Sequence, residues 1–161
     1  MKTTKLLTSI LCLISITAYA SPIVYLDQAK VQATSKVLQG ENTQINNNYN
    51  QMISKLKEEE RDLEKQIQQT PNPDNKLSIK ALEINQKLAL INNEKSEKLN
   101  DVQSRYLTIE KTVVNNLRIS QKYEYVLNAS SLIAADDRND ISATVTALTD
   151  KEYIVKYRHK Q

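Results

Sequence analysis

Two long stretches of this chain repeat apolar residues at the spacing of an α-helix. Between Thr43 and Gln69 an apolar residue returns every three or four positions, and no glycine or proline intervenes. From Asn75 to Leu117 the same spacing continues through a longer run. An α-helix with one apolar face has this period, so each stretch is predicted to form a single amphipathic helix.

The segment between the two stretches is predicted to be a turn. Pro71 and Pro73 fall within it, and a helix interior tolerates neither. Helices joined by a short turn lie antiparallel, so we expect a helical-hairpin arm, residues 43–111, with its tip near residues 70–75. The apolar stripes are expected to form the core of this arm, through Ile45, Tyr49, Met52, Leu56, Leu63, Ile67, Leu77, Ile84, Leu88, Ile91, Leu99, Val102 and Tyr106.

Two charged residues, Glu60 and Lys95, interrupt these stripes. Positions at equal distances from the tip pair 60 with about 85, so Glu60 and Lys95 are not expected to face each other. We interpret them as solvated positions that loosen the arm.

Both ends of the chain have strand and short-helix patterns instead. Residues 23–26 are predicted to form a strand, and Asp27 can cap a short helix that reaches about Leu38 and stops at Gly40. Near the other end, residues 123–127 and 132–135 are predicted to pair as a β-hairpin around a turn at 128–131. Asn139 or Asp140 can cap a last helix.

The first strand must find its partner about 100 residues further along the chain. We therefore expect an α+β fold, mostly helical, in which residues 21–42 and 112–161 form a small β-rich body that carries the arm. So small a body, without Trp or Phe, is marginal alone and should associate with other copies. The residues expected in its core or in contacts between copies are Ile23, Val24, Tyr25, Leu26, Val126, Leu127, Leu132, Ile133, Ile141, Val145 and Leu148.

Residues 1–20 are typical of a secretory signal peptide. Lys2 and Lys5 precede an apolar stretch too short to span a bilayer, and residues 18–20 have the small-x-small shape of a cleavage site. Cleavage after Ala20 is predicted, with a permanent anchor as the alternative. It would remove Cys12, the one cysteine, and leave a nearly neutral chain in an exported compartment.

Composition argues against an enzyme. The chain has one Gly, one Cys and one His, which disfavours a Gly-rich phosphate loop, a zinc cluster and a Cys–His catalytic pair. We expect no cofactor, no metal and no nucleic-acid partner, since the predicted mature chain lacks a strongly basic balance. The acidic run at residues 58–62 is interpreted as a solvated face, because consecutive side chains on a helix point in different directions.

The sequence resembles the Skp (OmpH) family of periplasmic chaperones over nearly its whole length. The resemblance rests on the leader, the strand at 23–27, residues 54–63 of the arm, residues 125–134, and the helix start at Asp140-Ile141. It implies a jellyfish-like homotrimer whose bodies form a hub and whose arms surround a cavity. There the family holds unfolded outer-membrane proteins without ATP.

One feature departs from the family pattern. Well-known members have basic arms, for which a lipopolysaccharide site has been proposed, whereas residues 43–111 here carry 11 basic and 11 acidic residues. That site is not carried over, and contact with a membrane or lipopolysaccharide surface is left open.

Apolar residues off the stripes are the candidates for client binding, because exposed apolar side chains can exchange many weak contacts. They are Ile53, Ile79, Leu82, Leu90 and Leu107. The alternative from another class is a structural coiled-coil adaptor of the cell envelope. An amphipathic envelope-binding protein is weaker still, since the arm lacks a basic face.

Overall fold

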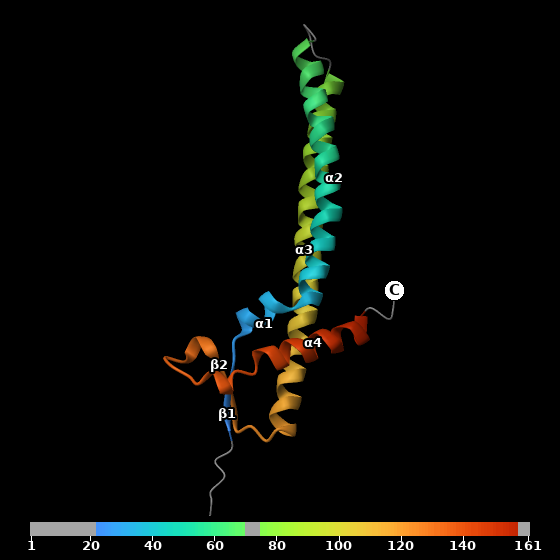
Figure 1. The fold of residues 1–161 in the computed structure, drawn as a ribbon. Helices are drawn as coiled ribbons and strands as arrows, with labels where there is room; N and C mark the ends of the chain where they lie inside the picture. Colours follow the sequence, from blue (N-terminus) through green and yellow to red (C-terminus); the bar gives the residue numbers. More distant parts are fainter. Residues whose placement is uncertain (1–21, 70–74, 158–161) are drawn as a thin grey trace, which may run out of the picture.

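The computed structural model describes residues 22–69 and 75–157, and the predicted leader and tip lie mainly outside them. The described chain is mostly helical, with a small two-stranded sheet (Figure 1). Its elements are β1 (Ile23–Leu26), α1 (Gln28–Thr34), α2 (Lys36–Gln69), α3 (Asn75–Ser120), β2 (Tyr125–Asn128) and α4 (Ser142–Tyr157), with two 3₁₀ turns, η1 (Ala129–Ser131) and η2 (Asp137–Asn139).

Helices α2 and α3 pack along each other and run in opposite directions, and most of their length projects away from the other elements (Figure 1). On α3, the buried and half-buried residues between Leu77 and Leu99 are the stripe positions. The Lys95 side chain, interpreted from sequence as solvated, is half-buried and donates a hydrogen bond to Asn50 Oδ1 at 3.0 Å. Positions 50 and 95 are equally far along the chain from the predicted tip, so this contact agrees with the expected pairing of 60 with about 85.

The root of α2 differs from the prediction. Helix α1 ends at Thr34, and α2 begins at Lys36, so Gly40 lies inside α2 and does not stop a helix. The break falls at Ser35, whose backbone is extended and whose hydroxyl accepts a hydrogen bond from Leu38 N at 3.0 Å. This is N-cap geometry, and one interior glycine costs a helix only about 1 kcal/mol.

The sheet joins the two ends of the chain, as predicted, but it contains no β-hairpin among the described residues. Strands β1 and β2 are parallel, with Ile23 opposite Tyr125 and Leu26 opposite Asn128. The predicted second hairpin strand at 132–135 is wrong, because Asn128 Oδ1 accepts hydrogen bonds from the N–H and hydroxyl of Ser130 and turns the chain into η1. Ile133 beyond this turn is fully exposed.

The main core lies where the body meets the root of the arm. It combines residues from β1, α1, α2, α3 and α4: Val24, Val31, Val37, Leu38, Val102, Tyr106, Ile109, Val113, Ile141, Val145 and Tyr153.

The residues predicted for the body core divide into three groups. Val24, Ile141 and Val145 are buried, while Tyr25, Leu26, Val126 and Leu132 are half-buried. In the single chain, Ile23, Leu127, Ile133 and Leu148 are exposed. Ile23 and Leu127 lie on the sheet, where successive residues point to opposite faces and the core packs on the face of Val24 and Val126. Ile133 follows η1, and Leu148 lies on α4. As core residues of one chain these four are wrong, and their role in contacts between copies stays a prediction.

Candidate binding surfaces

Three large apolar side chains lie exposed on α3, in the half of the helix nearest the tip. Ile79, Leu82 and Leu90 are 55%, 59% and 61% exposed. At about 100° per residue, all three fall on the side of α3 opposite its buried stripe and face away from α2. From Ile79 to Leu90 this row is about 16 Å long, at about 1.5 Å per residue.

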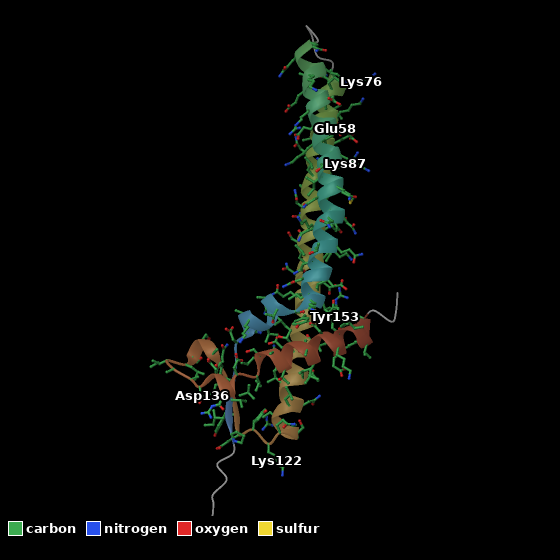
Figure 2. All side chains as sticks on the ribbon, in the orientation of Figure 1. Glu58, Lys76, Lys87, Lys122, Asp136 and Tyr153 are labelled. Atoms are coloured by element: carbon green, nitrogen blue, oxygen red, sulfur yellow. The ribbon has the colours of Figure 1, made fainter. Side chains whose placement is uncertain are left out.

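The surroundings of this apolar row are polar and mixed in charge. Figure 2 shows Glu58, Lys76 and Lys87 projecting from the same part of the helix pair. Glu83 and Gln86 are exposed close to the row on α3 itself. An apolar row framed by charges of both signs can make weak contacts with apolar segments without a strong field of one sign.

Two of the five residues predicted for client binding are placed differently. Ile53 is half-buried, whereas Met52, predicted in the arm core, is 46% exposed. The buried side of α2 passes through Tyr49, Ile53 and Leu56. The predicted stripe had Met52 where the structure has Ile53. Leu107 is half-buried beside buried Tyr106, in the part of α3 that contacts α4.

A second surface lies on the body, beside β2. A hollow of about 490 Å³ runs between β2 and α3, lined by apolar Leu26, Val114, Val126 and Leu127 and by the charged Lys111 and Arg118 among others. Tyr125, which also lines it, is more than half exposed.

Sequence reasoning missed one of the residues that line this hollow, a buried carboxyl. Glu110 is 3% exposed, and its Oε2 has no hydrogen-bond partner among the described residues. Burial raises the pKa of this carboxyl, against the opposing effects of a hydrogen bond from Gln28 and the charge of Lys111. Glu110 occupies the position next to stripe residue Ile109, and a charged residue beside a stripe is ordinarily solvated.

The described residues hold no cluster of three or more side chains suited to a metal ion. In the acidic run, Asp62 pairs with Lys65 at 3.1 Å, three residues further along α2, and both side chains are exposed. Among the helices described, none is both long and apolar enough to cross a membrane.

The sequence matches no known family model and no curated protein. The structure does match a solved one, the crystal structure of a protein from Caulobacter crescentus provisionally described as an OmpH-like outer membrane chaperone. The two share 15% sequence identity and a TM-score of 0.59, over 81% of this chain and 84% of the other. At that identity the likeness establishes the fold: the chain has an OmpH-like fold, in agreement with the resemblance seen in the sequence.

Proposed function

We propose that the protein is an ATP-independent periplasmic chaperone of the Skp (OmpH) type, which binds unfolded outer-membrane proteins between helical arms and prevents their aggregation. The observation that carries the proposal is the apolar row of Ile79, Leu82 and Leu90. Isolated exposed apolar residues are common, but three on one face of a projecting helix provide a surface for apolar segments of another chain.

The binding itself follows from the nature of these contacts. Each apolar side chain buries a modest area and fixes no geometry, so a client could exchange one contact for another without leaving the surface. Such binding needs no nucleotide and suits clients of unrelated sequence. The OmpH-like fold supports this reading, and the predicted signal peptide supports a periplasmic location.

We further propose that the protein acts as a homotrimer, with the body as the hub. A parallel sheet is ordinarily covered on both faces, and two strands alone are only marginally stable in water. Here the sheet has two strands, and Ile23, Tyr125 and Leu127 on it are exposed. Ile133 projects just beyond the sheet, and packing against neighbouring copies would cover these residues.

The test replaces Leu82 and Leu90 with serine and measures suppression of aggregation of an unfolded outer-membrane protein. Helix content and oligomer mass should stay near wild-type values, because both side chains are already exposed. Capture should weaken by roughly 30-fold or more, since burying each leucine contributes about 1 kcal/mol or more and the variant loses two of them.

A matched control replaces two exposed polar residues of α3 away from the row, Asn92 and Asn100, with serine. This control should capture clients as the wild type does. Unchanged capture by the leucine variant, with its fold intact, would show that clients do not bind this row.

A further inference from the structure

Helices α1 and α4 contact each other and run in the same direction (Figure 1). Polar contacts with α4 lie at both ends of α1. At one end, Ser142 Oγ accepts a hydrogen bond from Asp27 N at 2.9 Å. At the other, the Ser35 hydroxyl donates to Asp150 Oδ1 at 2.5 Å. Each pair is separated by 115 residues, so one register joins the whole of α1 to the first half of α4.

Asp150 does more than close this register, because it also contacts both long helices. Its Oδ2 accepts hydrogen bonds from the N–H groups of Lys36 at 3.1 Å and Val37 at 3.4 Å, the first two residues of α2. Its Oδ1 accepts a second hydrogen bond, from the Tyr106 hydroxyl of α3 at 3.1 Å. One carboxylate from α4 therefore bonds the junction of α1 and α2, the first turn of α2, and α3.

The junction that Asp150 holds is the point where the chain bends from the body into the arm. Only Ser35 separates α1 from α2, with φ −65° and ψ 115°. Helix α3 runs unbroken from the arm into the body, so the break at Ser35 leaves the direction of α2 against α3 and α4 to be fixed by its contacts. A carboxylate on the free N–H groups of a helix start is favourable both as a hydrogen-bond acceptor and toward the helix dipole.

We propose that Asp150 is the positioning residue that sets the direction of the arm relative to the body. Through that direction it sets the width of the space between arms, and hence the size of client that fits; this last step rests on the function proposed above. Thr34 and Thr146, whose hydroxyls lie 3.3 Å apart, strengthen the same junction, but they do not contact α2 or α3 through these atoms.

The test measures the direction of the arm by electron-spin distances. One spin label is placed at Gln68 on α2 and one at Thr144 on α4, both exposed, in full-length protein with Cys12 replaced by serine. Dilution with unlabelled protein confines the measured distances to single copies. Asp150→Ala, Asp150→Asn and the matched control Glu152→Gln, an exposed residue of the same helix, are compared with the unaltered chain.

Asp150→Ala should broaden the distance distribution, because losing such a cap raises the population of displaced arms by about 5- to 30-fold. Asp150→Asn keeps an acceptor oxygen and should broaden it less, while Glu152→Gln should leave it unchanged. A lower unfolding temperature with an unaltered distance distribution would overturn the proposal and make Asp150 an element of stability alone.

Client assays separate this inference from the proposed function. With displaced arms, capture of a large unfolded outer-membrane protein and of a small one should change by different factors. Equal loss for both, with a broadened distribution, would overturn the link to client size while leaving arm positioning in place. Absence of capture by the wild-type chain would overturn the proposed function, and the spin distances would still decide the role of Asp150.

Discussion

The arm and the body of this protein are held together in different ways. Along α2 and α3, each buried side chain contacts its neighbours across one helix pair, and the same pattern repeats from turn to turn. In the body, Val24, Val31 and Val145 belong to one cluster although they come from opposite ends of the chain. A destabilising substitution between α2 and α3 should therefore disturb only nearby turns. A substitution in the body cluster should disturb the packing of all the elements that contribute to it.

The largest expected effect comes from placing a charge in each region. Val145→Asp buries an unpaired carboxylate in a fully buried site, at a cost of several kcal/mol, a large share of the about 5–15 kcal/mol that stabilises a typical domain. We expect loss of oligomers and a large fall in helix content by circular dichroism.

Leu88→Asp is the counterpart in the arm. Leu88 is only half-buried, so the new carboxylate can reach water, and the protein should stay folded with a locally loosened helix pair. Equal loss of helix content in the two variants would mean that arm and body unfold as a single unit.

A smaller effect is expected at Glu110. Burial raises the pKa of this carboxyl in the folded state, so its contribution to stability is fully present below its ordinary pKa near 4.5 and is lost as pH rises through the raised value. Glu110→Gln removes this titration. At neutral pH the variant should be more stable, by about 1 kcal/mol, since an amide avoids the cost of a buried charge.

Urea unfolding at pH 4, 5, 6 and 7 checks this expectation, because the difference between the two proteins should grow with pH. A difference that is constant across the series would mean that Glu110 does not titrate in this range. The arm offers a control in Glu97→Gln, which removes an exposed carboxylate instead of a buried one.

The same contrast explains what the sequence could predict. Periodicity placed the start of α3 at Asn75 and its buried side through Val113, because a helix repeats one local geometry. The strand patterns at the two ends of the chain also predicted that the first strand would pair about 100 residues further on, and β1 pairs with β2. On α2 the choice between Met52 and Ile53 was wrong, because both fit a helical period and only the packing decides between them.

In the body, the missed features depend on contacts between distant residues. Ser35 ends α1 because its hydroxyl caps α2 and meets Asp150, and nothing local to Ser35 indicates that partner. The 132–135 segment has the composition of a strand, but pairing requires a neighbour, and Asn128 turns the chain away from β2. The neighbours of Glu110 in the sequence give no sign that it is buried. In the folded chain it is buried and has a hydrogen bond from Gln28 of α1.

The smallest expected effect concerns salt and client binding, and it sharpens the distinction between apolar and charged contacts. Residues 43–111 carry equal numbers of acidic and basic residues, so the arm has no net field to attract a charged client. Its surface charges are in any case screened beyond about 8 Å at physiological ionic strength. Between low salt and about 0.5 M salt, the affinity for an unfolded outer-membrane protein, measured by fluorescence titration, should therefore change by less than about threefold.

The Leu82→Ser, Leu90→Ser double variant should bind this client more weakly than wild type by the same factor at both salt concentrations, because apolar contacts do not depend on screening. A steep loss of wild-type affinity in high salt would assign binding to local charge patches, such as those around Lys76 and Lys87, and would remove the apolar row from its central place.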